Sequence, residues 1–178
     1  MNASPGGCAQ ETAPPPGAPR PVDDAETVLH FVRLALWLRW DNQGDPHLLH
    51  TAIRKEDLEA KTPGKSVSVY REPGTSAGEL SRRGLALNLQ PEWAADPVAA
   101  RASVLSLRQL IDVLAANWRL VCVNADPMLG ACLTHASIVR SDPKPGDKQR
   151  MQWLLVQSEV AAAFGQIAHL SGAAVRPI

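Results

Sequence analysis

The sequence predicts an α+β fold, a mixed and mainly antiparallel sheet with helices packed on it and a long C-terminal helix. Three observations predict this class. First, 45% of the 178 residues are apolar, which is enough for a sizeable core. Second, short segments with strand-like patterns interleave with segments of helical spacing. Third, the two kinds of segment do not follow the regular strand–helix–strand repeat that a parallel sheet requires.

The N-terminal 22 residues differ in composition from the rest of the chain. Six prolines and three glycines fall within residues 1–22, and few of the other side chains there are suited to burial. This composition is typical of a flexible segment that favours polyproline II. The expected organisation is a disordered Pro/Gly/Ala-rich tail over 1–22, followed by a single globular α+β domain over 23–178.

The first half of the domain contains one ambiguous element and two predicted strands. Residues 27–40 fit helical spacing on one face and strand alternation on another, and the choice stays open with a slight preference for helix. Residues 66–71 alternate between polar and apolar side chains after a Pro-Gly pair, which predicts a strand. Residues 84–89 alternate again and predict a second strand.

The second half of the domain is predicted to alternate between helices and strands. Residues 91–101 are Ala-rich and predict one or two helical turns, and residues 106–118 have the spacing of an amphipathic helix. Residues 120–123 predict a buried strand, and residues 133–139 predict another strand. Residues 148–169 follow an Asp suited to N-capping and predict a helix of about 22 residues, long enough to support a sheet.

The balance of charge argues against a protein whose main function is to bind nucleic acid or an anionic membrane. The 18 basic residues equal the 18 acidic ones, whereas such binding depends on clustered cations. Nucleic acid is therefore an unlikely partner. A weak nucleic-acid-binding module stays a third candidate function, and it would use five scattered cations: Arg54, Lys55, Lys61, Lys65 and Arg71.

The three cysteines, Cys8, Cys122 and Cys132, form an odd set without a C-x-x-C pair. This pattern predicts neither a disulfide framework nor a zinc site, and Cys122 reads as a small buried apolar residue. Reduced thiols and a start without a signal-peptide pattern predict a cytoplasmic location. The longest apolar segment, 28–38, is shorter than the roughly 20 residues that span a membrane, so no membrane association is expected.

Two histidines stand in matching local sequences. His50 and His135 are each followed by two small residues, an isoleucine, a cation two positions later and an aspartate two positions after that. Histidine is the side chain whose ordinary pKa lies near neutrality, so it can accept a proton in one step and return it in the next. Two histidines flanking one phosphate would serve as base and acid.

The sequence His135-Ala136-Ser137-Ile138 resembles the His–apolar–Ser/Thr–apolar motif of the 2H phosphoesterases, in which two such motifs face each other across a bilobal sheet. The separation of 85 residues is similar to the spacing in that family. The resemblance implies that His50 and His135 form the acid–base pair and that Ser137 bonds a phosphate oxygen. The first motif departs from the family, because Ala52 stands where a hydroxyl is expected. Three cations would neutralise phosphate: Arg54, Lys55 and Arg140.

His47 and His50 also form an H-x-x-H pair, and with Asp45 they have residue types that ligate metals. No third ligand of suitable spacing is evident, so no metal and no cofactor are predicted. The chain contains no Walker motif, no G-x-G-x-x-G and no nucleophile elbow.

The leading expectation is a small cytoplasmic interaction or accessory protein that acts through a protein partner or through self-association. Five tryptophans offer aromatic anchors for an interface. The alternative is a 2H-like phosphoesterase or RNA-processing enzyme, so the sequence leaves open whether the protein is an enzyme. The enzyme hypothesis requires both imidazoles in one open cleft, and the interaction hypothesis requires an exposed apolar patch that includes a tryptophan.

Overall fold

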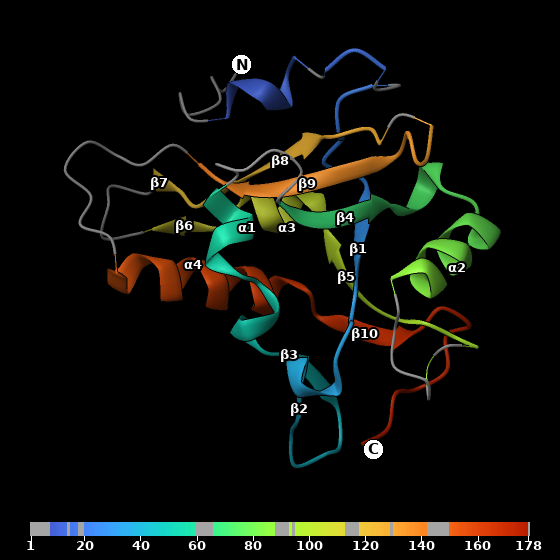
Figure 1. Ribbon diagram of the computed structural model, residues 1–178. Coiled ribbons are helices and arrows are strands. Elements are labelled where there is room, and N and C mark those ends of the chain that lie inside the picture. Colours follow the sequence, from blue (N-terminus) through green and yellow to red (C-terminus); the bar gives the residue numbers. More distant parts are fainter. Residues whose placement is uncertain are drawn as a thin grey trace.

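A computed structural model describes most of the chain, namely residues 8–13, 15–17, 20–59, 66–87, 93, 95–112, 118–128, 130–141 and 150–177. Its centre is a six-stranded sheet in which every pairing is antiparallel (Figure 1). In spatial order the strands are β10 (Gln166–His169), β5 (Val98–Ser103), β1 (Thr27–Phe31), β4 (Val67–Arg71), β9 (His135–Arg140) and β8 (Val121–Ala125).

Shorter elements surround this sheet. Two small two-stranded sheets pair β2 (Leu38–Trp40) with β3 (Pro46–Leu48) and β6 (Ile111–Asp112) with β7 (Trp118–Arg119). The α-helices are α1 (Lys55–Glu59), α2 (Ala77–Ala86), α3 (Val104–Arg108) and α4 (Arg150–Ala163). Single 3₁₀ turns occur at η1 (Ala9–Glu11), η2 (Ala35–Trp37), η3 (His50–Ala52) and η4 (Glu72–Gly74).

The core lies on both faces of the sheet. Alternate residues of β1 point to opposite faces, so Val28 packs in the cluster that includes Val156 of α4, whereas Leu29 packs in the cluster that includes Leu80 of α2. Figure 1 shows α4 lying across one side of the sheet and α2 standing at one end of it. The α+β class predicted from the sequence is therefore confirmed.

Three predicted strands are present, at β4, β8 and β9. The preference for helix over 27–40 was wrong, because this segment contains β1, η2 and β2. Strand β1 is central and its residues are buried on both faces, so its apolar residues are nearly continuous and carry no clear period. The helical turns expected over 91–101 were also wrong in part, since the interior strand β5 occupies the end of that segment.

Two predicted helices and one predicted strand need correction. The helix over 106–118 is replaced by the short α3, capped by Ser103, and by β6. The strand over 84–89 is replaced by the end of α2, whose N-terminus is capped where Ser76 accepts a hydrogen bond from the Glu79 N–H. The long C-terminal helix is shorter than predicted: α4 has 14 residues, and the chain returns to the sheet as β10.

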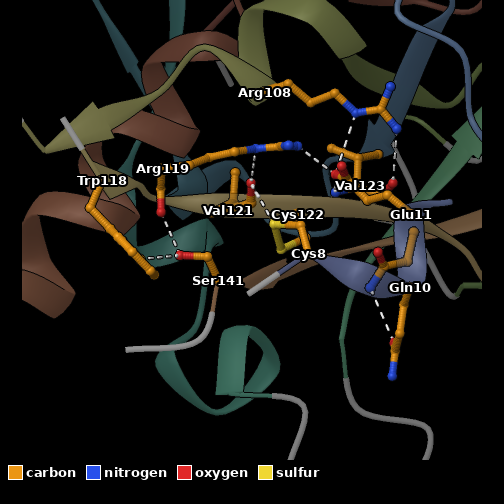
Figure 2. The surroundings of a disulfide bond; sticks show 11 residues. Cys8, Gln10, Glu11, Arg108, Trp118, Arg119, Val121, Cys122, Val123 and Ser141 are labelled. Carbon is orange, nitrogen blue, oxygen red and sulfur yellow. Dashed lines mark hydrogen bonds and ion pairs between the residues drawn. A yellow bond between two sulfur atoms is a disulfide. The ribbon is translucent and has the colours of Figure 1, made fainter. Parts of the chain in front are cut away.

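The N-terminal segment runs along β8, at one edge of the sheet (Figure 1). Cys8 and Cys122 form a disulfide with a Cα–Cα distance of 5.4 Å, across a sequence separation of 114 residues (Figure 2). The prediction of free thiols at these two positions was therefore wrong, because the fold brings together residues whose spacing in sequence showed no relation. Cys132 is a buried free thiol. The division into a tail and a domain at residue 22 stays a prediction, although Cys8 and Glu11 are both buried.

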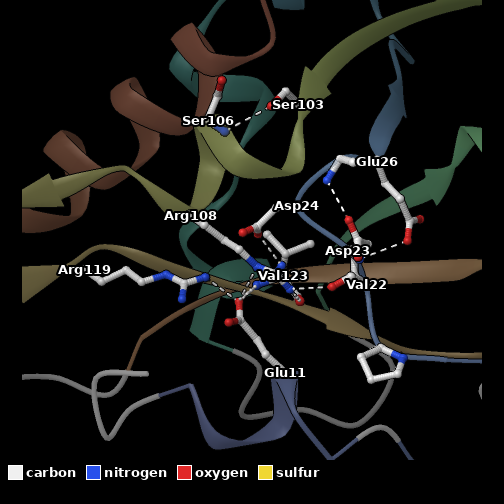
Figure 3. Close-up of polar contacts among 12 residues, drawn as sticks. Glu11, Val22, Asp23, Asp24, Glu26, Ser103, Ser106, Arg108, Arg119 and Val123 are labelled. Atoms are coloured by element: carbon white, nitrogen blue, oxygen red, sulfur yellow. Dashed lines mark hydrogen bonds and ion pairs between the residues drawn. The ribbon is translucent and has the colours of Figure 1, made fainter. Parts of the chain in front are cut away.

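The carboxylate of Glu11 occupies the outer edge of β8 (Figure 3). Its Oε1 atom accepts a hydrogen bond of 2.6 Å from the Val123 N–H and pairs with the guanidinium groups of Arg108 and Arg119. Arg119 also donates to the Val121 carbonyl at 2.9 Å. These contacts satisfy backbone groups that an exposed edge strand would leave open to pairing with another chain.

Candidate functional site

Two hollows lie on the surface beside the segment that connects β1 to α1. The first, called here the His50 hollow, has a volume of about 280 Å³. His47 and His50 both line it, together with Arg39 and with Ser158 of α4. Its apolar lining includes Leu48 and Phe164. The hollow therefore combines a cation and two imidazoles with an apolar lining, which suits an anionic ligand.

The polar side chains around the His50 hollow differ in whether they contact a partner. His47 Nε2 lies 3.0 Å from Asp41 Oδ2, and this contact fixes the orientation of the imidazole ring. His50 is exposed at the start of η3, which packs against α4. Arg39 is exposed and has no ion-pair partner among the described residues. One oriented imidazole, one exposed imidazole and one unpaired guanidinium thus face the same space.

The second hollow, called here the Trp37 hollow, has a volume of about 410 Å³. It is lined by Leu34, which precedes the η2 turn, by Trp37, which ends that turn, and by Leu87 at the end of α2. Arg33 also lines it and has no ion-pair partner within the described part of the chain. Leu36, between Leu34 and Trp37 in sequence, has 79% of its surface exposed, the highest value among the described large apolar residues.

His30 forms part of the wall of the Trp37 hollow. Its ring stacks on Trp37 with a centroid distance of 6.1 Å, and its Nδ1 lies 2.9 Å from the Ser68 carbonyl oxygen. A carbonyl only accepts hydrogen bonds, so Nδ1 donates and the proton of the neutral ring resides there. Burial lowers the pKa of His30 below its ordinary value, and the bond to Ser68 only partly opposes this.

The structure places His135 and Ser137 in the interior rather than in a cleft. His135 is 4% exposed; its Nδ1 donates to the Asp126 carbonyl oxygen at 2.6 Å and its ring meets that of Tyr70 edge-on. Burial lowers the pKa of His135, with Asp126 opposing the shift. Ser137 is buried opposite Ser68 and Asn124. The His50 hollow does not include His135 among its lining residues, so the structure does not bring the two histidines together there.

The three cations assigned to phosphate binding have contacts elsewhere. Arg54 lines the Trp37 hollow but forms two hydrogen bonds to Asp57, of 2.9 and 3.0 Å. Lys55 and Arg140 lie over the ring of Trp153, at 5.4 and 4.6 Å from its centroid. The catalytic and phosphate-binding assignments made from the sequence stay predictions, and none of these three cations lines the hollow that contains His50.

One of the five cations proposed for nucleic-acid binding, Arg71, is not exposed. Arg71 is buried and its guanidinium donates to both carboxylate oxygens of Glu26 at 2.7 Å. Lys61 and Lys65 lie outside the described residues. Asp45, the third residue of the metal pattern with His47 and His50, is exposed in the β2–β3 turn and does not line the His50 hollow.

Sequence reasoning counted Trp37 among five possible interface anchors but missed Arg33 and Arg39 as site residues. The only local signal of these two arginines was polarity within an apolar segment, because they interrupt the run that was read as a possible helix. The His50 hollow forms only when the hairpin of β2 and β3, η3 and α4 meet, and that contact joins residues more than 100 positions apart.

Comparison of the chain with known protein families, with curated proteins and with solved structures finds no match. The fold and the two hollows are thus the basis for any functional assignment. None of the described helices has both the length and the apolar character needed to cross a bilayer.

Proposed function

We propose that this protein is a small interaction or accessory protein that docks a segment of a protein partner on the Trp37 hollow. The observation that supports the proposal is the exposure of Leu36, which stands in sequence between Leu34 and Trp37, two residues that line a hollow large enough for one or two side chains. Aromatic and aliphatic side chains in such a position are the usual anchors of an interface.

Charge indicates the chemistry of the partner segment. Arg54 and Asp57 neutralise each other at the hollow, so the charge left over is that of Arg33. A cation that faces a partly apolar space is complemented by a carboxylate next to a large apolar side chain. The proposed occupant is therefore a partner segment in which an acidic residue neighbours an aliphatic or aromatic one.

Selection of peptides from a random displayed library on the immobilised full chain tests this proposal. We expect enrichment of peptides that carry an acidic residue beside a large apolar one, and binding that falls at least tenfold in Leu36→Asp and in Arg33→Glu. The matched control is Leu154→Asp, which alters an exposed leucine of α4 and should leave binding unchanged. Enrichment without this pattern, or equal loss in the control, would contradict the proposal.

Self-association is the competing use of the same surface. Sedimentation velocity of the full chain at increasing concentration separates the two, because a monomer that binds peptides supports a separate partner. A dimer that Leu36→Asp converts to a monomer would show instead that a second copy of this chain covers the hollow.

A second candidate function is phosphoesterase activity, and the observation that favours it is the presence of two imidazoles and Arg39 at the His50 hollow. In this version of the phosphoesterase hypothesis, His47 replaces His135 as the partner of His50, and Asp41 holds the His47 ring. Arg39 would neutralise the phosphate and Ser158 would bond one of its oxygens.

Hydrolysis of a 2′,3′-cyclic nucleotide by the full chain tests this candidate. Loss of turnover by at least 100-fold in both His47→Asn and His50→Asn, with turnover retained in His135→Asn, would assign the reaction to the hollow. Loss in His135→Asn while the protein stays folded would restore the pair predicted from the sequence. Absence of turnover by the unmodified chain would exclude both versions for this substrate.

A cytoplasmic location stays a prediction. The disulfide between Cys8 and Cys122 removes the argument from reduced thiols on which that prediction partly relied.

A further inference from the structure

Three buried side chains with metal-binding chemistry meet where the N-terminal segment contacts β8. Cys8 and Glu11 come from the turn η1 and its approach, and Cys122 comes from β8 (Figure 2). Their ligand atoms, the two Sγ atoms and a carboxylate oxygen, all lie within 4.8 Å of one another. All three residues are buried. No function described above uses this cluster.

We propose that, when the disulfide is reduced, Cys8, Glu11 and Cys122 bind one zinc ion. Zn²⁺ prefers thiolate sulfur and accepts carboxylate oxygen in a tetrahedral arrangement. Two sulfurs at about 2.3 Å from one Zn²⁺ lie roughly 3.8 Å apart, so small side-chain rotations bring ligand atoms that are already this close onto one ion. Water would complete the fourth position.

The surroundings of Glu11 suit a metal ligand. Its contacts with Arg108, Arg119 and the Val123 N–H all go to Oε1 (Figure 3), so Oε2 is not engaged by these three groups and can ligate the ion. Bonds of this kind fix the orientation of a ligating carboxylate. Two thiolates and one carboxylate carry three negative charges against two positive charges on the ion. Arg119 offsets the remaining charge, and Arg108, the second cation at Glu11, is itself paired with Asp24.

The chemistry links the two states of the cluster. A dithiol reductant transfers two electrons and two protons to the Cys8–Cys122 bond and becomes a disulfide itself. Zn²⁺ then displaces the two thiol protons as it binds the thiolates. In the oxidised protein the sulfurs are bonded to each other and offer no thiolate. Residues 8–13 are therefore held on β8 by the disulfide or by the ion, and only the reduced, metal-free chain releases them.

Cobalt titration of the tag-free full chain tests the site, since Co²⁺ takes the place of Zn²⁺ and is visible by absorption. One preparation is kept oxidised, and another is reduced with dithiothreitol, which is then removed without oxygen. We expect the reduced chain to bind one Co²⁺ with thiolate-to-cobalt absorption that one equivalent of Zn²⁺ abolishes. The oxidised chain should bind none. This comparison uses one sequence, so it does not depend on the folding of a variant.

Three variants assign the ligands. Cys8→Ser and Cys122→Ser should each weaken Co²⁺ binding at least 100-fold, whereas Cys132→Ser, which alters the buried thiol outside the cluster, should bind like the unmodified chain. Circular dichroism confirms that each variant is folded. The proposal is overturned if the reduced, folded chain binds no Co²⁺, if the oxidised chain binds it equally, or if Cys132→Ser abolishes the signal.

Discussion

The imidazoles of His30 and His135 are both buried and have the same tautomer. Each donates from Nδ1 to a backbone carbonyl, and the Nε2 atom of each is buried without a hydrogen-bond partner among the described residues. Adding a proton at Nε2 would create a charge in a place that offers it no acceptor. Burial therefore lowers the pKa of both side chains, so both rings stay neutral in the folded protein near pH 7.

The lowered pKa values predict a loss of stability in mild acid. Below the ordinary histidine pKa of about 6.5, the unfolded chain binds protons that the folded chain does not, so stability falls as the pH falls. Each histidine contributes a slope of at most about 1.4 kcal/mol per pH unit. Urea unfolding at pH 7, 6 and 5 measures it, and His30→Phe, which keeps a ring against Trp37, should reduce the slope.

The matched control for this measurement is His50→Asn, because His50 is exposed. Its slope should equal that of the unmodified chain. An unchanged slope in His30→Phe would mean that His30 binds protons equally in the folded and unfolded protein, which would contradict a pKa lowered by burial.

At the scale of elements, the sequence predicted best the strands β4, β8 and β9, which are short apolar or alternating segments. It failed at β1 and β5, two neighbouring interior strands. Both faces of these strands are covered, so Val28 and Leu29 of β1 are equally apolar, and three alanines of β5 are buried. Burial on two sides removes the alternation from which strands are recognised.

The error at α2 has a different cause. Residues 84–89 alternate like a strand, but Ser76 caps a helix that extends to Ala86. A side chain at Gly84 would place its Cβ 2.6 Å from Pro97, so the glycine permits α2 to pack closely on the chain before β5. The glycine at position 84 is explained by the close contact between α2 and a segment distant in sequence, and a local sequence pattern does not indicate such a contact.

The candidate site was predictable only in part. His50 was selected from the sequence and does line a hollow, but His47 and Arg39 join it there rather than His135. The match between the two local sequences did not show whether each histidine is buried or which way its side chain points. His135 lies on an inner strand, whereas His50 lies on a turn outside the sheet, so equal motifs stand in unequal surroundings.

In the whole molecule, both edges of the sheet are covered by the ends of the chain. The segment after β10 folds back along this strand and forms an isolated β-bridge between Ala168 and Ala174. On the other side, Cys8 and Glu11 lie on β8, tied by the disulfide. Exposed edge strands pair readily with other chains, so this arrangement keeps the antiparallel sheet from associating through its edges.

Breaking the disulfide should therefore lower both stability and solubility. The bond closes a segment of 114 residues, and linking residues so far apart restricts the unfolded chain, which corresponds to about 2–5 kcal/mol. We expect dithiothreitol with a metal chelator to lower the urea midpoint of the unmodified chain and to promote dimers through β8. Cys8→Ala should begin at the lowered midpoint and respond little to reduction, whereas Cys132→Ala should respond like the unmodified chain. If thiol counting shows full reduction while the midpoint does not move, the N-terminal segment is held by Glu11 and its arginines alone.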